Sequence, residues 1–588
     1  MSKRDRVFLV VVSLFLISLC FSCTGQYSPE QKNTNVRGKK GDTSAISADK
    51  GMVVSVDEYA SRVGVETLRK GGNAVDAAIA VGFALAVTYP SAGNIGGGGF
   101  MIIRFPDERA PVALDFREMA PVKAAADMYL DEGGHYVKMR SLYGHLAVGV
   151  PGTVMGFELA SQRYGVLEWE DLLAPAVELA EKGFELTERR ARGFNYARER
   201  FPKATEEFIK IFTTESGSPF KKGDRFKNKD LGESLRLIAR DGSDAFYVGK
   251  LAEKISEDMA RNSGLITQKD LESYRALERT PISGTYRGFR IISMPPPSSG
   301  GTILVEMLNI LEGFELGQMK RFAPKTLHLI AETMKFAYLD RARYMGDSDF
   351  GDIPVDRLTS KLHAADIRKK IHSDRAIPSS ELGKEILTLE EAKETTHYSV
   401  IDKDRLAVAT TYTLNGGYGA GVVVPGTGIL LNNEMADFNM TPGFTDAEGL
   451  IGTEPNFIQP HKRMLSSMTP TIIEKKGEVY LITGSPGGRT IINTILNVII
   501  NVCEFQMDIQ EAVDAPRIDH EWMPDVLNVE RKWIPDDVIH ALREMGHTFK
   551  RSSRLWSQGD AHSILIDPRT GIYYGAADRR SEGAAIGY

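Results

Sequence analysis

Glu394 Thr395 Thr396 His397 Tyr398 Ser399 Val400 is the stretch around which this sequence of 588 residues is organised. Its alternation and its β-branched and aromatic residues are typical of a half-buried strand, and on local pattern alone an ordinary strand is the simpler interpretation. The chemical interpretation is that Thr395 is a nucleophile. A threonine hydroxyl needs a base within hydrogen-bond reach. The residue's own α-amino group, with an unperturbed pKa of roughly 7.7 to 8.0, is such a base.

That amine exists only if the chain is cut between Glu394 and Thr395. The Thr395 hydroxyl can make the cut by attacking the carbonyl of Glu394, provided that the fold holds this peptide bond in a reactive geometry. One residue would then both mature the protein and catalyse its reaction. His397 lies on the same predicted strand, and we interpret it as a structural histidine rather than as the base.

A second run of residues favours the chemical interpretation. Thr411 Tyr412 Thr413 Leu414 Asn415, and then Gly419, follow after one strand's length. Together the two runs resemble the active-site signature of the γ-glutamyltranspeptidase family, a threonine branch of the N-terminal nucleophile (Ntn) hydrolases. The resemblance spans nearly all of residues 51–588. It implies an α+β fold, a four-layer αββα sandwich of the Ntn hydrolase type.

The resemblance also implies the residues that recognise the substrate. A γ-glutamyl group carries a carboxylate and an ammonium at a fixed distance from the attacked carbon. A carboxylate suits an arginine fork with hydroxyls, whereas an ammonium needs acceptors. The matching positions are Arg117, Ser466 and Ser467 for the carboxylate, and Asn415, Glu434 and Asp437 for the ammonium. Taken alone, Arg117 would be interpreted as a surface or paired arginine.

Three further positions match catalytic residues of the family. Thr413 matches the hydroxyl that orients Thr395. Gly487 and Gly488, in the run Gly-Ser-Pro-Gly-Gly, match the oxyanion-hole glycines, since backbone N–H groups without side-chain obstruction stabilise a tetrahedral oxyanion best. In isolation this run would be interpreted as a turn before a helix. Residues 440–463 match the lid loop, with Glu448 where some bacterial members carry an aromatic residue.

The mechanism that the resemblance implies is ping-pong. Thr395 takes the γ-glutamyl group from glutathione or a related amide as an ester, and water, an acceptor amino acid or a dipeptide removes it. Two alternatives stay open: an acylase of the same fold that cleaves glutaryl-type amides, and an exported binding lipoprotein that never cleaves itself. The acylase is disfavoured by the retained ammonium acceptors, because a glutaryl group has no ammonium.

Composition and motifs restrict the partners. The net charge of −6 is small for this length, and the Lys and Arg residues are scattered, so nucleic acid is not an expected partner. We expect no metal and no organic cofactor, because the sequence has no His-Glu-x-x-His, paired-cysteine or dinucleotide motif. Cys503 is the only thiol of the folded body, which leaves no internal disulfide there.

The N-terminus predicts export. Lys3, Arg4 and Arg6 precede an apolar run from Val7 to Leu19, which is typical of a signal peptide spanning residues 1–23. Cys23 would then carry lipid and anchor the protein, and simple signal cleavage to a soluble periplasmic protein is the alternative. Residues 24–50 are predicted to be a flexible tether.

The remaining pattern predicts two subunits of one fold. Residues 51–394 would form the large subunit and residues 395–588 the small one, and neither closes a core alone. Helices are predicted at 57–70, 73–87, 303–311, 490–502 and 536–545, and strands at 101–104, 112–116, 395–401, 406–413, 429–431, 470–474, 479–483, 563–567 and 572–576. Glycines 96–99 predict a close approach of backbone to a neighbouring strand or to the active site. Residues 379–393 are predicted to be an exposed processing tail.

Overall fold

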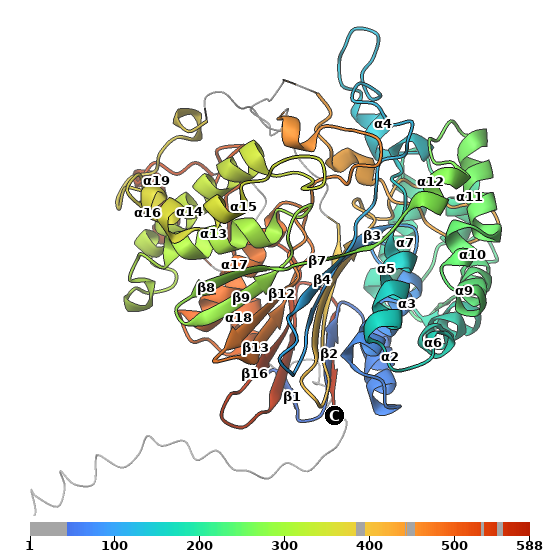
Figure 1. Ribbon diagram of the computed structural model, residues 1–588, viewed down its shortest axis with the longest axis horizontal. Coiled ribbons are helices and arrows are strands. Elements are labelled where there is room, and N and C mark those ends of the chain that lie inside the picture. Colours follow the sequence, from blue (N-terminus) through green and yellow to red (C-terminus); the bar gives the residue numbers. More distant parts are fainter. Residues whose placement is uncertain (1–43, 384–393, 442, 444–452, 531–533, 550–556) are drawn as a thin grey trace, which may run out of the picture. The chain divides into compact units, whose positions relative to one another are not determined.

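Two seven-stranded antiparallel sheets face each other at the centre of the computed structural model, and helices cover both outer faces (Figure 1). The structure describes residues 44–383, 394–441, 443, 453–530, 534–549 and 557–588, which all belong to the compact unit Val36–Tyr588. The predicted α+β class and four-layer αββα sandwich are confirmed.

The order of strands in the first sheet is β1-β17-β16-β13-β12-β9-β8, and in the second it is β18-β2-β10-β11-β3-β4-β7. The first sheet comprises β1 (Ile46–Ala48), β8 (Ile282–Tyr286), β9 (Phe289–Ser293), β12 (Thr471–Lys475), β13 (Glu478–Thr483), β16 (His562–Ile566) and β17 (Tyr573–Ala577). The second comprises β2 (Met52–Ser55), β3 (Gly98–Arg104), β4 (Val112–Phe116), β7 (Leu277–Arg279), β10 (Thr396–Ile401), β11 (Ala407–Thr413) and β18 (Ala584–Gly587). Two short pairs lie outside the sheets, β5 (Phe184–Glu185) with β6 (Arg225–Phe226) and β14 (Ile518–Asp519) with β15 (Asn528–Val529). Each sheet contains strands from before and after residue 395.

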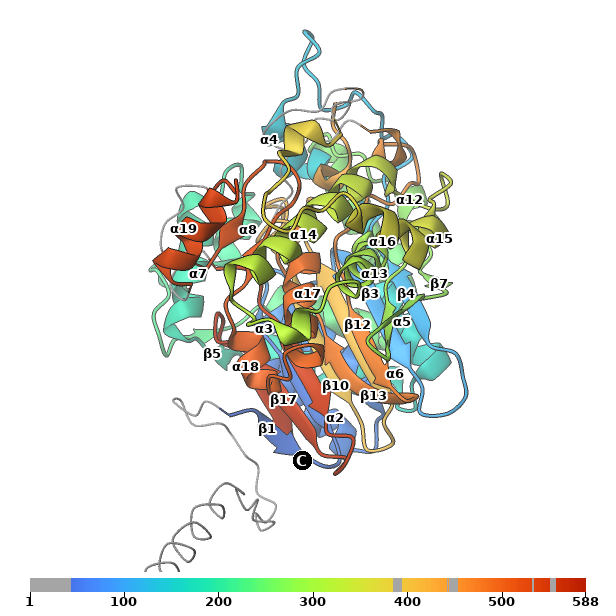
Figure 2. The ribbon, with the colours of Figure 1, turned by 90° about the vertical axis from the view of Figure 1, so that its left-hand side faces the viewer.

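The helices form the two outer layers (Figures 1 and 2). Beyond the second sheet lie α2 (Glu58–Arg69), α3 (Ala74–Thr88), α5 (Thr153–Tyr164), α6 (Trp169–Lys182), α7 (Glu188–Arg200), α8 (Glu206–Ile211), α9 (Lys229–Asp241), α10 (Asp244–Tyr247), α11 (Lys250–Arg261) and α12 (Gln268–Ser273). Beyond the first lie α13 (Gly300–Leu311), α14 (Pro324–Tyr344), α15 (Val355–Leu358), α16 (Lys361–Arg368), α17 (Thr490–Cys503), α18 (Ile509–Asp514) and α19 (Asp536–Glu544). A short helix, α4 (Lys138–Leu142), lies near the end of the sandwich that carries η4 (Glu434–Asp437).

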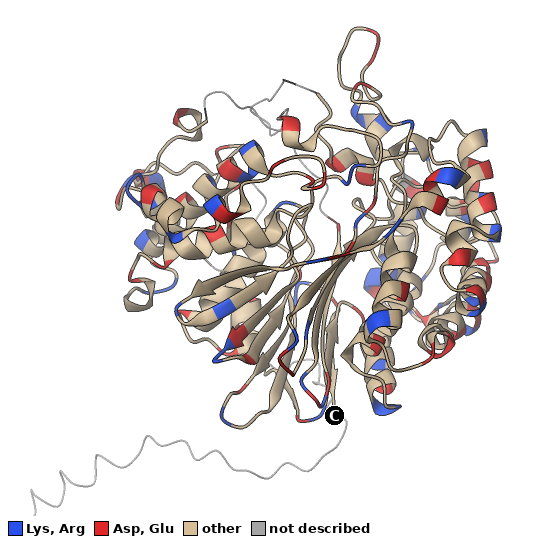
Figure 3. Ribbon diagram, viewed as in Figure 1, with Lys and Arg blue, Asp and Glu red and all other residues tan. Residues whose placement is uncertain are grey.

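Charged residues gather on the helices and loops, whereas the strands of both sheets carry few (Figure 3). This distribution follows from burial, because a charge between two packed layers loses its hydration. Among the described residues, no helix is both long enough and apolar enough to cross a membrane.

Helix α3 and the glycines after it position the centre of the second sheet. Asn73 and Asp76 form the predicted capping box, and every residue of α3 is buried. Gly97 and Gly99 lie against β11: a Cβ on Gly97 would sit 2.1 Å from the carbonyl oxygen of Thr413, and one on Gly99 2.4 Å from the Cβ of Tyr412. The predicted close approach is therefore confirmed, and it brings β3 against the strand that carries Thr413.

Three sequence predictions need correction. The tether was predicted to reach residue 50, but Ile46–Ala48 pairs with β17 as strand β1, so the fold begins earlier. The predicted strand at 429–431 is an isolated bridge between Val423 and Leu430. The predicted processing tail does not begin at Ser379, because this side chain is buried and its hydroxyl donates to the Trp522 carbonyl oxygen at 2.6 Å.

Some predictions concern residues that the structure does not describe. The predicted signal peptide, residues 1–23, and the tether as far as residue 43 lie outside the described residues, as do residues 384–393 of the processing tail.

Candidate active site

The bond between Glu394 and Thr395 lies directly before β10. Strands β10 and β11 pair with Thr396 opposite Tyr412, so the next residues in register, Thr395 and Thr413, are neighbours. Both hydroxyls donate to the Glu394 carbonyl oxygen, Thr395 Oγ1 at 2.7 Å and Thr413 Oγ1 at 2.8 Å. The Asn415 backbone N–H in turn donates to Thr413 Oγ1 at 2.8 Å, which fixes that hydroxyl. The nucleophile thus lies beside the carbonyl it would attack, and a second donor already points at the oxygen where charge would develop.

A small cavity next to Thr395 gathers the residues predicted from the sequence. Its volume is about 20 Å³, roughly the room that one water molecule needs. The cavity is lined by Arg117, Thr395, Thr413, Asn415, Glu434, Asp437, Ser466, Ser467, Met468, Gly488 and Ile491. Of the ten predicted site residues, only Gly487 is not part of its wall. We call it the head-group cavity.

Arg117 is the centre of an ion-pair cluster in this cavity. It is 1% exposed, and its Nη1 lies 2.6 Å from Glu434 Oε2 while its Nη2 lies 2.5 Å from Asp437 Oδ2. The Met464 and Leu465 carbonyl oxygens accept further hydrogen bonds from the guanidinium, at 3.3 and 3.2 Å. In the uncut chain, therefore, the predicted carboxylate-binding and ammonium-binding groups neutralise one another.

Glu118 adds a third acid to this cluster and was not predicted from the sequence. It is fully buried, and its Oε2 lies 3.5 Å from Arg117 Nη1. Burial raises the pKa of Glu118 to about 8, although the Arg117 charge opposes the shift. Burial likewise raises the pKa of Glu434 well above its usual range, with Arg117 opposing and Glu118 and Asp437 adding to it. Burial alone would lower the Arg117 pKa, but the three acids raise it further, so the guanidinium stays charged.

The serine pair is held by the run Pro-Pro-Pro-Ser-Ser-Gly-Gly at residues 295–301. The backbone N–H and the hydroxyl of Ser299 both donate to the Ser466 carbonyl oxygen at 2.8 Å. Arg341 on α14 donates from Nη2 to Ser467 Oγ at 2.8 Å and from Nε to Ser299 Oγ at 2.9 Å. Arg341 is a buried positioning residue that the sequence analysis missed. The available signal was an arginine in a helix whose residues 326–342 are all buried, because such a charge needs partners.

Gly487 and Gly488 form the turn between β13 and α17. Their φ angles are +136° and +57°, a region that residues with a Cβ rarely adopt. The Thr490 and Ile491 N–H groups donate to the Gly487 and Gly488 carbonyl oxygens at 3.2 and 3.1 Å, which starts the helix. The turn thus faces Thr395 with the N-terminal end of α17, where backbone N–H groups favour negative charge.

His397 is not part of the cavity wall. Its Nδ1 lies 2.8 Å from Thr411 Oγ1, and its Nε2 lies 3.1 Å from Ser399 Oγ. Burial lowers the pKa of His397 well below its usual range, so the ring is neutral. It packs against Gly484, where a Cβ would lie 2.2 Å from the ring. These contacts agree with a structural histidine between the two sheets.

The predicted lid loop is described only at its two ends. Asn439 and Phe457 form a bridge that closes the base of the loop, and Glu448 lies outside the described residues.

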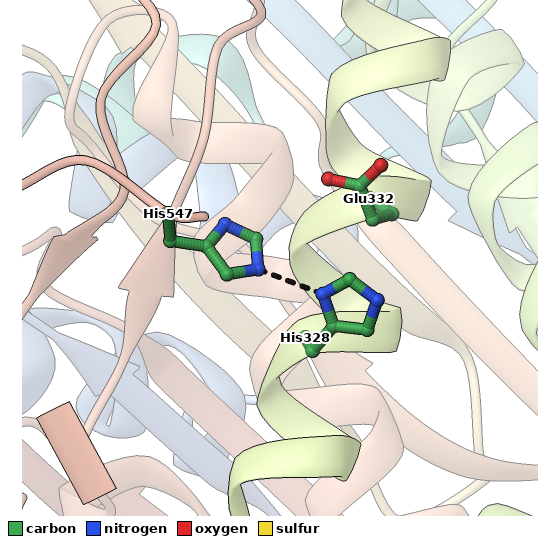
Figure 4. A group of neighbouring side chains, drawn as sticks. All are labelled: His328, Glu332 and His547. Carbon is green, nitrogen blue, oxygen red and sulfur yellow. Dashed lines mark hydrogen bonds between the residues drawn. The ribbon is translucent and has the colours of Figure 1, made fainter. Parts of the chain in front are cut away.

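A second buried cluster, outside the head-group cavity, consists of His328, Glu332 and His547 (Figure 4). Side chains of these types also bind metal ions in proteins. His328 Nδ1 lies 2.8 Å from His547 Nε2, and His328 Nε2 lies 2.8 Å from the His372 carbonyl oxygen. Glu332 accepts from Lys335 Nζ at 2.7 Å. Burial lowers the pKa of His547 to about 2, with the neighbouring cationic groups adding to the shift. Each of these side chains already has a hydrogen-bond partner, and their bonds to the His372 carbonyl oxygen and the Ile377 N–H hold that segment against α14.

A second such group joins α13, α14 and α16. His363 Nε2 lies 2.7 Å from Asp340 Oδ2 and 3.5 Å from Glu306 Oε1. Hydrogen bonds to these two acids raise the pKa of His363 to about 9, so the group is an ion pair within the helical layer.

Comparison with known proteins places the chain in a family. The family model described as Gamma-glutamyltranspeptidase matches residues 60–588. The chain is 45% identical to the glutathione hydrolase proenzyme of Escherichia coli, over 97% of each chain.

Two solved structures are similar as well. The cephalosporin acylase of Bacillus halodurans matches with a TM-score of 0.81 and 27% identity, over 97% of this chain and 99% of that one. The γ-glutamyltranspeptidase of Helicobacter pylori matches with a TM-score of 0.55 and 45% identity, over 60% of this chain and 96% of that chain. With this coverage and this identity, the protein belongs to the γ-glutamyltranspeptidase family.

Proposed function

We propose that this protein is a γ-glutamyltransferase and glutathione hydrolase that matures by cutting itself between Glu394 and Thr395. The family and the similarity to the glutathione hydrolase proenzyme support the activity. The observation that carries the self-cleavage is that the Thr395 and Thr413 hydroxyls both donate to the carbonyl oxygen of the bond to be cut.

Maturation then proceeds by an acyl shift followed by hydrolysis. Thr395 Oγ1 attacks the Glu394 carbonyl carbon, and the hydroxyl of Thr413 stabilises the oxyanion that forms. The carbon–nitrogen bond breaks, the hydroxyl proton ends on the freed amine, and an ester joins Glu394 to Thr395. Water hydrolyses this ester, which leaves a carboxylate on Glu394 and a free α-amine on Thr395. The products are a large subunit ending at residue 394 and a small one beginning at residue 395.

Turnover uses the same hydroxyl with its new base. The α-amine of Thr395 takes the hydroxyl proton, Oγ1 attacks the γ-glutamyl carbonyl, and the N–H groups of Gly487 and Gly488 receive the oxyanion. The leaving amine takes the proton, and a γ-glutamyl ester remains on Thr395. Water then releases glutamate, or the amine of an amino acid or dipeptide acceptor takes the acyl group.

The head-group cavity supplies recognition of the γ-glutamyl group. The carboxylate of the γ-glutamyl group would replace Glu434 and Asp437 as the partner of Arg117, with hydrogen bonds from Ser466 and Ser467. Its ammonium would pair with the released Glu434 and Asp437 and with the side chain of Asn415. A glutaryl group has no ammonium, so it would leave Glu434 and Asp437 buried without a cationic partner. The free-energy cost of these unpaired charges would exceed the gain from the contact between the substrate carboxylate and Arg117. This contrast favours γ-glutamyl compounds over the glutaryl-type amides of an acylase.

The proposal is tested on a denaturing gel together with an activity assay. The wild-type chain should give two fragments that separate at Glu394 and Thr395, and should release glutamate from glutathione and p-nitroaniline from γ-glutamyl-p-nitroanilide. Thr395→Ala should give one intact chain and lose at least about 10³-fold in kcat. Thr396→Ala, the next residue of β10, is the matched control and should cut itself normally. An intact wild-type chain would overturn the proposal and favour a binding protein.

Export is a separate part of the proposal. We infer that residues 1–23 direct export and that lipid on Cys23 holds the protein at the membrane, which the basic residues and the apolar run at the N-terminus support. Metabolic labelling with a radioactive fatty acid should mark the wild-type chain and not Cys23→Ala. A wild-type chain that is exported without label would favour the alternative, a soluble periplasmic protein.

A further inference from the structure

Two carboxylates and one imidazole meet where three helices pack beyond the first sheet. Glu306 comes from α13, Asp340 from α14 and His363 from α16, and these helices lie together in both views of the ribbon (Figures 1 and 2). One nitrogen or oxygen atom of each side chain lies within 4.8 Å of the other two. We call this group the three-helix cluster. None of the ten predicted site residues belongs to it, so the mechanism above leaves it without a role.

Glu306 is a buried acid with too few partners. Its side chain is 0% exposed. Within the part of the chain that the structure describes, neither of its carboxylate oxygens accepts a hydrogen bond. Its Oε1 lies 3.5 Å from His363 Nε2, which is longer than an ordinary N–H···O hydrogen bond. Because a buried carboxylate without close partners is costly, Glu306 needs a cation in addition to His363.

The charges of the cluster do not balance without a further cation. His363 Nε2 lies 2.7 Å from Asp340 Oδ2. Among the described residues, His363 is the one cation that forms an ion pair with either Glu306 or Asp340. One imidazolium facing two carboxylates leaves a net negative charge in the helical layer. A divalent cation with two carboxylates and a neutral imidazole gives a net charge of zero.

We propose that Glu306, Asp340 and His363 bind one divalent transition-metal ion, and that Zn²⁺ is the ion that their donor atoms suit best. Zn²⁺ takes imidazole nitrogen and carboxylate oxygen as ligands, and ligands about 2 Å from a tetrahedral ion lie roughly 3.3 Å apart. The measured separations of 3.5 and 2.7 Å lie on either side of this value. Binding replaces the proton on His363 Nε2 by the bond to the ion, and the proton passes to water.

Access to the cluster is from the His363 side. The His363 side chain is 16% exposed, whereas that of Glu306 is fully buried. An ion therefore enters past the imidazole, and a water molecule on the same side completes a set of four ligands. The metal motifs that the sequence lacks place their ligands close together along the chain, whereas these three ligands come from three helices.

The ion supports the wall of the head-group cavity. Helix α13 begins directly after Ser299, and Asp340 directly precedes Arg341 on α14. Arg341 donates to Ser299 Oγ and to Ser467 Oγ. Metal bonds between α13 and α14 thus hold together the two helices that position the serine pair.

The test measures bound zinc and thermal stability on the purified full-length protein. The protein is stripped with EDTA, dialysed against Zn²⁺ and then against metal-free buffer, and its zinc content is measured by inductively coupled plasma mass spectrometry. The wild type should retain about one Zn²⁺ per chain. Added Zn²⁺ should raise its Tm by roughly 3 °C, and Mg²⁺, which prefers oxygen ligands and keeps its waters, should not.

Two variants remove one ligand each. Glu306→Gln deletes the carboxylate charge with little change in size, and His363→Gln removes the imidazole at a partly exposed position. Each should lower the retained zinc at least about tenfold and abolish the rise in Tm. His540→Gln is the matched control, because His540 faces Glu544 on an exposed side of α19, and it should keep both responses.

Three results would overturn the inference. The first is a wild type that retains no zinc. The second is zinc that is lost in His540→Gln but kept in Glu306→Gln and His363→Gln, since that ion would be bound at the surface. The third is a Glu306→Gln variant that retains as much zinc as the wild type. If Glu306→Gln does not fold, His363→Gln decides the matter alone.

These measurements are separate from the proposed function. Zinc content and Tm do not depend on catalysis, so a chain without hydrolase activity can still bind the ion. Self-cleavage and hydrolysis of γ-glutamyl-p-nitroanilide by the two variants show that they fold. An active enzyme without zinc would overturn this inference alone.

Discussion

The two cavities that meet at the Glu394–Thr395 bond are built in opposite ways. The head-group cavity has about 20 Å³ and is surrounded by buried charges that already pair with one another. On the other side of the bond, a cavity of about 480 Å³ is lined by residues that include Glu394, Tyr418 and Arg189, and Arg189 reaches solvent. We call it the outer cavity. A closed set of buried charges rejects any ligand that leaves one of them unpaired. An open cavity with one exposed cation tolerates many ligands.

This difference corresponds to the two halves of the proposed substrate. The γ-glutamyl head is the same in every donor, and its carboxylate and ammonium replace a pairing that the protein makes within itself. The leaving group and the acceptor vary from one substrate to another. We therefore expect selectivity for the γ-glutamyl head to depend on the ion-pair cluster around Arg117.

Thr413 lines the head-group cavity and contacts the Glu394 carbonyl oxygen, and of the three changes discussed here its removal should have the largest effect. Thr413→Val deletes one of two hydroxyl donors to the Glu394 carbonyl oxygen. Self-cleavage should slow by about 10²–10³-fold, as expected for the loss of one oxyanion donor. The rate is measured on denaturing gels after cell-free synthesis of the precursor. Thr410→Val, on the opposite face of the same strand, is the control. Cleavage of Thr413→Val at the wild-type rate would show that the hydroxyl has no role in maturation.

Arg117 should separate the two cavities most clearly. Arg117→Lys replaces the planar fork by a single ammonium, which cannot hold both Glu434 and Asp437 in their present places. We expect kcat/KM for hydrolysis of γ-glutamyl-p-nitroanilide to fall about 100-fold, while the KM of glycylglycine stays unchanged. Arg104→Lys is the control and should change neither kcat/KM nor the KM of glycylglycine. Arg104 is a buried arginine at the end of β3 that pairs with Glu474 on β12, in the facing sheet. If Arg117→Lys raises the acceptor KM as well, the two sites are not independent.

Glu118 tests the charge state of the closed cavity and should have the smallest effect. Its pKa is raised from 4.5 to about 8 in the folded chain, so between these values the folded state holds a proton that the unfolded state releases. The free energy of unfolding should therefore fall as the pH rises from about 4.5 to 8. In a Thr395→Ala background, which keeps the chain uncut, Glu118→Gln should lose part of this decline, by a few degrees in Tm.

The control for that measurement is Glu253→Gln, an exposed position on α11. A difference in Tm between Glu118→Gln and its parent that is constant from pH 5 to 8 would contradict a raised pKa at Glu118.

Local sequence signals predicted the parts of the fold that local physics decides. The capping box at Asn73 and the close approach at Gly97 follow from residue type and spacing. The position of Thr413 beside Thr395 was implied by the family resemblance. The edge strand β1 was missed because three residues flanked by a polar segment carry too little pattern to separate a strand from a tether.

The ion pairs around Arg117 could not be predicted from the sequence. Arg117, Glu434 and Asp437 were assigned to different ends of a substrate, but their pairing depends on the tertiary position of η4 against β4. Glu118 and Arg341 carried no recognisable spacing, and only their burial reveals that they need partners. Arg405 stands in the tight turn between β10 and β11 with a φ of +68°, a conformation that residues with a Cβ adopt infrequently.

Both sheets contain strands from each side of the proposed cut between Glu394 and Thr395. Strand β10, which begins one residue after Thr395, is hydrogen-bonded to β2 on one side and to β11 on the other. The proposed cut before this strand would remove no hydrogen bond of either pairing, so the two polypeptides would share the core of the uncut chain. We therefore expect neither piece to fold alone, and we expect the freed α-amine of Thr395 to stay in place because the next residue is held in the centre of the second sheet.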